Sequence, residues 1–170
     1  MLFHLHKIIL GGDSVTICDL AQMLFLNSVS AKARVTGNGI NGEVNFYQLD
    51  DRVLVTAEVE GLPKKSFDCE CGVFGFHIHE GESCTGTAED PFADTKGHYN
   101  PDKCPHPCHA GDMPPLFGND GSAWMAFITD RFEVRNIIGK TVVIHSMPDD
   151  FTTQPAGNSG KKIACGVIEQ

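Results

Sequence analysis

The chain has 170 residues, of which 41% are hydrophobic and 21% charged, and its 13 basic and 22 acidic residues give a formal net charge of -9. A chain of this length and composition can bury the core of one compact domain without depending on disulfides. The acidic balance argues against nucleic acid or an anionic membrane as the main partner. The sequence contains no apolar run near the roughly 18 residues that a membrane span needs.

Residues 1–30 are expected to form an N-terminal extension, because their pattern differs from the rest of the chain. Apolar residues recur at helix-like spacing from Ile17 to Leu26, after a Gly-Gly-Asp break, and predict a short helix. His4 and His6 alternate within an apolar stretch that offers no further ligands. We interpret them as polar residues of a short strand.

The same segment bears on localisation. The letters AQMLFL followed by SAKA supply the apolar stretch and the small residues of an export signal, but Asp13 and Asp19 precede them. The sequence therefore favours cytoplasmic residence slightly and leaves export open.

Residues 31–170 are expected to form one all-β domain. Short alternating segments separated by turn residues predict strands, as in Val53, Val55, Ala57 and Val59. The predicted strands cover residues 44–49, 53–59, 73–79, 123–129, 141–145 and 163–168. Strands at this spacing indicate an antiparallel sandwich or barrel. Its core is predicted to contain the aromatic residues Phe74, Phe76, Trp124 and Phe127.

Residues 81–121 interrupt this pattern. The segment is rich in Pro, Gly, Cys and His and has no clear periodicity. A long loop without regular structure inside a compact domain is usually functional.

Four histidines in separate motifs suit a copper ion. His77 and His79 lie two apart on a predicted strand, so both imidazoles project to one face while Ile78 points into the apolar layer. His145 ends another apolar strand, and His98 lies in the long loop. Four imidazoles match the nitrogen ligands that copper prefers.

A second set overlaps the first. His98, His106, His109 and Asp112 lie within fifteen residues, and three imidazoles with one carboxylate make the tetrahedral set that zinc prefers. His98 belongs to both sets. An imidazole has two ring nitrogens, so this one ring can bridge two metals.

These motifs resemble the copper/zinc superoxide dismutases. The likeness runs from about Val35 to Ile168 and rests on the ordered segments GFHIHEGESCTG, GHYNP, HAGDMP, VVIHSMPDD and GNSGKKIACGVI. It implies an eight-stranded Greek-key β-barrel with copper and zinc as cofactors. It also implies an oxidoreductase that converts two superoxide anions into oxygen and hydrogen peroxide.

The resemblance assigns roles to individual positions. It implies copper ligands at His77, His79, His98 and His145, and zinc ligands at His98, His106, His109 and Asp112. It further implies a disulfide between Cys84 and Cys165. Asp149 matches the carboxylate that links ligand histidines of the two metals, and His98 also takes part in catalysis.

Two features depart from the family pattern. Lys162 stands where the family usually has an arginine that docks the anionic substrate, so the charge remains but the forked geometry is lost. The zinc loop is also short, since only Pro107 and Cys108 separate His106 from His109.

The shortened loop leaves the roles of several thiols open. Cys104 and Cys108 become candidates to replace a histidine on zinc or to pair with each other. We interpret the remaining cysteines as small hydrophobic residues or free thiols, namely Cys18, Cys69 and Cys71.

The sequence is also compatible with two other functions. One is a copper- or zinc-binding protein without turnover on the same barrel, which Lys162 and the free thiols favour. The other is a copper-only dismutase whose compressed loop no longer holds zinc. The oligomeric state is not determined by the sequence, and a homodimer is kept as an option.

Overall fold

The computed structural model describes residues 28–64 and 72–170. The predicted helix over residues 17–26 and the interpretations of His4, His6 and Cys18 lie outside the described residues. So do the interpretations of Cys69 and Cys71.

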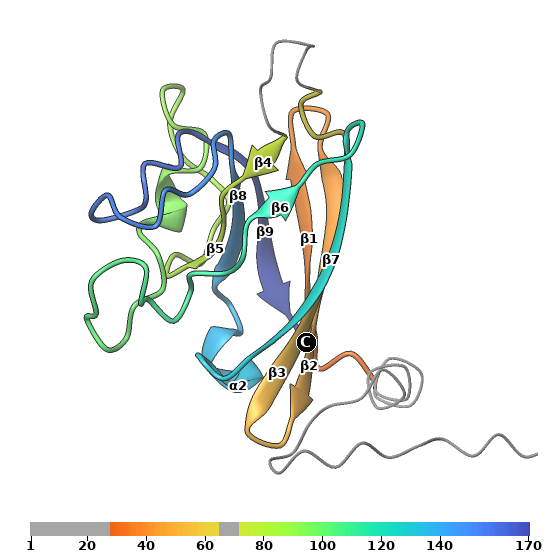
Figure 1. Ribbon diagram of the computed structural model, residues 1–170, viewed down its shortest axis with the longest axis vertical. Coiled ribbons are helices and arrows are strands. Elements are labelled where there is room, and N and C mark those ends of the chain that lie inside the picture. The colour runs from red at the N-terminus through yellow and green to blue at the C-terminus, as the bar shows by residue number, and fades with distance from the viewer. Residues whose placement is uncertain (1–27, 65–71) are drawn as a thin grey trace, which may run out of the picture.

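An antiparallel sheet that curls on itself dominates the described chain (Figure 1). Seven strands form it in the order β5-β8-β9-β1-β2-β3-β7, and β4 pairs with β6 in a separate two-stranded sheet. The strands are β1 (Ala31–Gly37), β2 (Asn41–Leu49), β3 (Arg52–Glu60), β4 (Val73–Phe74), β5 (Phe76–His79), β6 (Leu116–Phe117), β7 (Ser122–Thr129), β8 (Thr141–His145) and β9 (Lys162–Glu169). The predicted all-β class is confirmed, and the arrangement fits a Greek-key β fold.

The predicted strand over residues 73–79 is divided at Gly75 into β4 and β5. The Gly75 amide donates to the carbonyl of Met147 at 2.8 Å, and its carbonyl accepts the amide of His145 at 2.8 Å. A Cβ at this position would lie 2.9 Å from the Cβ of Ser159. Glycine therefore permits the close approach at which the strand changes partners. Counted as one interrupted strand, β4 and β5 bring the strands of the described residues to the eight that were expected.

The core lies inside the curled sheet and follows the predicted alternation. Val53, Val55, Ala57 and Val59 of β3 are buried, and Phe74 and Phe76 are completely buried. Burial of these apolar side chains is the main favourable contribution to folding. Phe127 is partly buried and packs against the same core.

The prediction that Trp124 lies in the core is wrong. Its side chain is 66% exposed. Trp124 pairs with the exposed Glu58 of β3, whereas Ala123 pairs with the buried Val59. Because successive residues of a strand face opposite sides, Ala123 takes the inward position and Trp124 the outward one.

Short helical turns connect the strands. The 3-10 helix η1 (Ala93–Thr95) lies in the long loop, and α2 (Val134–Ile137) precedes β8. Val134 and Ile137 bury their side chains against the core. Within residues 28–64 and 72–170, no helix is long and apolar enough to cross a membrane.

Candidate metal centre

The strands β5 and β8 supply three of the candidate ligands. They pair antiparallel, with Phe76 opposite Ile144 and His79 opposite Thr141. Ile78 points into the core and is completely buried. The alternation places His77 and His79 on the other face, where the long loop covers and buries them.

The long loop reaches the same place through backbone hydrogen bonds to β5. The amide of Tyr99 donates to the carbonyl of Ile78 at 2.8 Å, and the amide of Ile78 donates to the carbonyl of Gly111 at 2.9 Å. A Cβ on Gly111 would collide with the Ile78 carbonyl, so this contact requires glycine. As a result, His98 lies beside His79 and Asp112 lies beside His77.

The first group of candidate ligands contains four buried histidines. One ring nitrogen from each lies within 4.8 Å of the others, and the four residues are His77, His79, His98 and His145. Nε2 of His79 is 3.2 Å from Nε2 of His145. Nδ1 of His79 donates to the carbonyl of Lys96 at 2.9 Å, because a carbonyl only accepts. When His79 is neutral, its Nε2 therefore presents a lone pair to the centre of the group.

Burial favours the neutral imidazoles that metal binding requires. It lowers the pKa of His77 and holds the pKa of His79 well below the usual value. Burial, together with the imidazoles of His77 and His98, lowers the pKa of His145 to about 3. The ring nitrogens His77 Nδ1, His98 Nε2 and His145 Nδ1 are buried without a hydrogen-bond partner. Buried polar atoms are rarely left unpaired, so a cluster of this kind suits the binding of a metal cation.

The second group has three histidines and one carboxylate, and its ligating atoms also lie within 4.8 Å of one another: His98, His106, His109 and Asp112. Asp112 Oδ1 lies 2.7 Å from His98 Nδ1 and 3.3 Å from His109 Nδ1, and Oδ2 lies 3.1 Å from His106 Nδ1. Burial alone would raise the pKa of Asp112, but the hydrogen bond from His98 holds it below the usual value. The donor set fits zinc.

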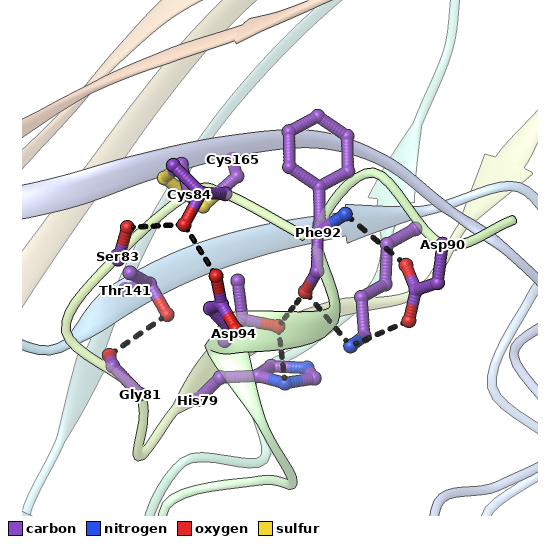
Figure 2. The surroundings of a disulfide bond; sticks show 12 residues. His79, Gly81, Ser83, Cys84, Asp90, Phe92, Asp94, Thr141 and Cys165 are labelled. Carbon is purple, nitrogen blue, oxygen red and sulfur yellow. Dashed lines mark hydrogen bonds and ion pairs between the residues drawn. A yellow bond between two sulfur atoms is a disulfide. The ribbon is translucent and has the colours of Figure 1, made fainter. Parts of the chain in front are cut away.

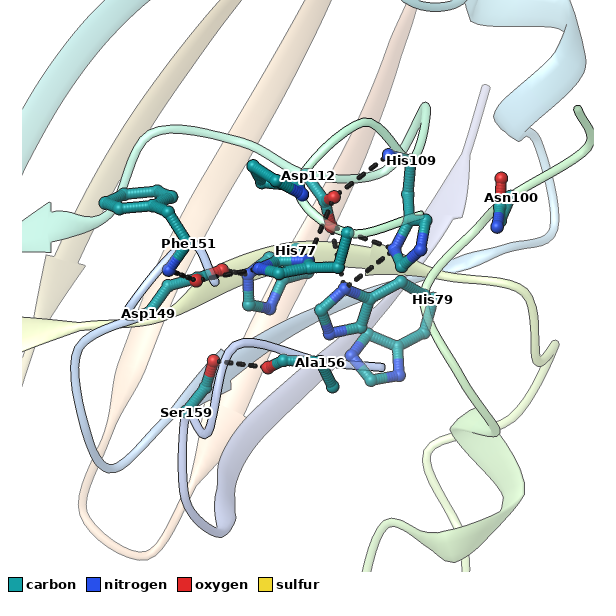
Figure 3. Close-up of polar contacts among 12 residues, drawn as sticks. His77, His79, Asn100, His109, Asp112, Asp149, Phe151, Ala156 and Ser159 are labelled. Carbon is teal, nitrogen blue, oxygen red and sulfur yellow. Dashed lines mark hydrogen bonds and ion pairs between the residues drawn. The ribbon is translucent and has the colours of Figure 1, made fainter. Parts of the chain in front are cut away.

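Asp149 joins the two groups (Figure 3). Its Oδ2 accepts from Nε2 of His77 at 2.7 Å, and its Oδ1 accepts from Nε2 of His106 at 2.9 Å. The amide of Phe151 also donates to Oδ1 at 2.7 Å. Burial opposes the charge, but these hydrogen bonds hold the pKa of Asp149 well below the usual value. Each histidine therefore has its Nε2 proton fixed, which leaves Nδ1 free to bind a metal.

His98 is shared by the two groups. Its Nδ1 lies among the second group, 2.7 Å from Asp112 Oδ1 and 3.4 Å from His109 Nδ1. Its Nε2 is buried and has no hydrogen-bond partner, and its ring stacks on that of His77 with the centroids 3.9 Å apart. The two nitrogens of this ring are therefore in different surroundings.

Lys162 lies at the start of β9 and pairs with His145 across the sheet. Its Nζ donates to the carbonyl of Phe92 at 3.0 Å and lies 3.4 Å from Oδ2 of Asp90 (Figure 2). Its positive charge is one of the influences that lower the pKa of His145, after burial and two neighbouring imidazoles. Lys162 therefore places a positive charge next to the first group.

Cys84 and Cys165 form a disulfide, as the family resemblance implies (Figure 2). It connects the long loop to β9 across 81 residues of sequence. Cys104 and Cys108 are free thiols, and neither belongs to a group of candidate ligands among the described residues. Among the described residues the second candidate group thus consists of histidines and a carboxylate, and Cys104 and Cys108 are not paired with each other.

Replacing Cys84 with serine is expected to lower the free energy of unfolding of the metal-free protein by about 2 to 4 kcal/mol, because the unfolded chain gains freedom. Denaturant unfolding without reductant measures this loss. Cys108→Ser removes an exposed free thiol and is the matched control, with little expected change. Equal unfolding midpoints for Cys84→Ser and the wild type would contradict the prediction.

Arg131 is a residue of the site that the sequence analysis missed. Its Nη1 lies 2.9 Å from the carbonyl oxygen of Pro107, 3.2 Å from that of His109 and 3.3 Å from that of Asp112. It follows β7 and is 22 residues from His109 in sequence. No local pattern marks it, because its partners are backbone atoms of a distant loop.

We expect Arg131→Ala to weaken zinc binding about tenfold to a hundredfold, since contacts of this kind orient the ligands themselves. Competition with a chromogenic chelator, on protein that lacks copper, measures the zinc affinity. Arg135→Ala is the control, because Arg135 is exposed and contacts Glu133 instead of the loop. Equal zinc affinity in the two variants would show that Arg131 does not support the site.

Comparisons with known proteins agree on one family. The sequence model of the family described as "Copper/zinc superoxide dismutase (SODC)" matches residues 40–168. Superoxide dismutase (Cu-Zn) 1 of Aquifex aeolicus is 33% identical over 173 residues, which cover 88% of this chain and 96% of that protein. Superoxide dismutase (Cu-Zn) of Deinococcus radiodurans is 32% identical over 177 residues, which cover 93% and 91%. The structure of Cu/Zn superoxide dismutase from Brucella abortus superimposes with a TM-score of 0.69 and 25% identity, covering 82% of this chain and 100% of that one.

Proposed function

The chain belongs to the copper/zinc superoxide dismutase family and catalyses copper-dependent dismutation of superoxide, and we propose that its two histidine groups are the copper and zinc sites of this reaction. Copper would be held by His77, His79, His98 and His145, and zinc by His98, His106, His109 and Asp112. The observation that carries this assignment is His98, whose Nδ1 lies in one group while its Nε2 has no hydrogen-bond partner.

When bound, copper supplies the alternating one-electron exchange that turns two superoxide anions into oxygen and hydrogen peroxide, while zinc takes no part in electron transfer. His98 would take a proton from water at Nε2 in one half of the cycle and give it to the departing product in the other, and the second proton of hydrogen peroxide would come from solvent. Its Nδ1 stays in the zinc group, so the ring keeps its position throughout. Asp149 fixes the orientation of His77 and His106.

Lys162 is proposed to attract the anionic substrate to the copper group. The side chain is 16% exposed and its backbone pairs with His145. A lysine is a point charge without the forked geometry of arginine, so it attracts an anion without orienting it. In a chain with a net charge of -9, this local attraction is expected to weaken as ionic strength rises.

Reconstitution of the metal-free protein tests the assignment. Samples loaded with copper and zinc, with copper alone and with zinc alone are compared for metal content and superoxide-dependent activity. We expect one copper and one zinc per chain, and activity only where copper is present. Stoichiometric copper without activity would favour a binding protein without turnover. Full activity with no zinc taken up would favour a copper-only dismutase.

We also propose that the protein is a homodimer formed through β6 and β7. Phe117 and Trp124 are 65% and 66% exposed on these adjoining strands, and exposed aromatic side chains are typical of interfaces. Analytical ultracentrifugation is expected to give a dimer for the wild type and a monomer for Trp124→Glu. A wild type that is monomeric at tens of micromolar would overturn this proposal.

A further inference from the structure

We propose that Asp90 masks the charge of Lys162 and thereby weakens anion binding beside the copper group. This inference rests on the proposed docking role of Lys162. The carboxylate Oδ2 of Asp90 lies 3.4 Å from Nζ of Lys162. Among the described residues, Asp90 is the acidic group at ion-pair distance from this lysine (Figure 2).

The loop holds the Asp90 carboxylate in place. Its Oδ1 accepts the amide of Phe92 at 3.1 Å. The amide of Asp90 donates to Oγ1 of Thr87 at 3.1 Å, and its carbonyl accepts the amides of Thr87 and Ala93 at 2.9 and 3.1 Å. The carboxylate therefore presents Oδ2 to Lys162 while Oδ1 is occupied by the turn. Because the turn already fixes this carboxylate, forming the ion pair with Lys162 costs little additional side-chain conformational entropy.

The same loop reaches the copper group. The carbonyl of Phe92 accepts from Nζ of Lys162 at 3.0 Å and from Oγ1 of Thr95 at 2.8 Å. Oγ1 of Thr95 lies 3.5 Å from Nδ1 of His79. One connected set of polar contacts thus runs from Asp90 through Lys162 to His79 of the copper group. Figure 2 shows these contacts in the surroundings of the disulfide.

The sign of the effect follows from the charges. A negative charge 3.4 Å from the docking cation lowers the positive potential that an approaching anion meets. Asparagine at position 90 would remove this charge but keep an oxygen that can accept the Phe92 amide, so the turn should persist. Asp90→Asn should therefore strengthen anion binding and increase its dependence on Lys162.

The experiment uses the copper- and zinc-loaded protein and azide, a small anion that binds copper(II). Azide affinity is measured from the visible absorption of the copper, and the rate constant with superoxide is measured over a range of ionic strength. We expect Asp90→Asn to raise both about twofold to fivefold at low ionic strength, with the gain falling as salt increases.

Asp94→Asn is the matched control. It changes the net charge by the same amount in the same loop, but Asp94 interacts with Thr85 and not with Lys162. The increases in azide affinity and in rate constant should stay below about half of those in Asp90→Asn, because distant surface charges are screened. Should Asp90→Asn fold poorly, Asp90→Ser also removes the charge and keeps an acceptor for the turn.

Two further variants separate this inference from the proposal on which it rests. Lys162→Gln should weaken azide binding. When Asp90→Asn is added to Lys162→Gln, azide affinity should rise no more than it does in Asp94→Asn. Unchanged azide affinity in Lys162→Gln would refute the docking role of Lys162. If Lys162→Gln weakens azide binding but Asp90→Asn matches Asp94→Asn, or keeps its gain without Lys162, the inference about Asp90 alone is wrong.

Discussion

Replacing His98 with alanine is expected to lower superoxide dismutation by more than about a hundredfold and to reduce the content of both metals, because loss of an orienting contact alone costs tenfold to a hundredfold. His98 is the residue common to the two groups. Its Nδ1 lies 2.7 Å from Asp112 in the zinc group, and its buried Nε2 has no hydrogen-bond partner. On the proposed assignment, one substitution therefore removes a ligand from each ion.

Two other variants serve as controls for the double loss. His79 belongs only to the proposed copper group and His109 only to the proposed zinc group. His79→Ala should lose copper and activity while it retains zinc, and His109→Ala should lose zinc first. Mass spectrometry of metal content, measured alongside activity, distinguishes the three patterns. A His98→Ala protein that loses one metal but binds the other normally would contradict the shared ligand.

Asp149→Asn is expected to weaken the binding of both metals about tenfold to a hundredfold, and to lower activity accordingly. The carboxylate accepts from Nε2 of His77, from Nε2 of His106 and from the amide of Phe151. An asparagine has one oxygen, so its NH2 group would face a ring N–H that also donates. At least one histidine must then turn or change its tautomer, which moves the lone pair away from the metal.

Competition titrations with copper and zinc chelators measure the two affinities. Asp150→Asn is the matched control, because Asp150 is the next residue in the chain and is exposed. Its carboxylate accepts hydrogen bonds from Thr152 and Thr153 and contacts no histidine. Affinities for both metals that stay within about twofold of the wild type in Asp149→Asn would show that this carboxylate does not support the centre.

Much of the centre could be predicted because its signals are local. His77 and His79 lie two apart in an apolar strand, and the period of a strand alone puts both on one face. The strand of Val53 to Val59 was predicted for the same reason, since alternation records which face is buried. The structure brings the predicted histidines into two groups, as their dispersed motifs suggested.

Other features depend on tertiary contacts that no local pattern records. Trp124 was assigned to the core together with the other aromatic residues, but its register opposite Glu58 places it outside. Arg131 binds carbonyl groups of a distant loop, and carbonyl groups are the same in every residue. Asp90 becomes relevant only because the loop folds back onto β9. Such roles follow from the path of the chain and not from residue type.

A crystal structure of the copper- and zinc-loaded protein, with anomalous scattering recorded at both metal edges, tests the bridging role most directly. We predict that the ring of His98 lies between the ions in the oxidised protein, with Nδ1 on zinc and Nε2 on copper. A ring that contacts a single ion, or that faces solvent and contacts neither, would contradict the account.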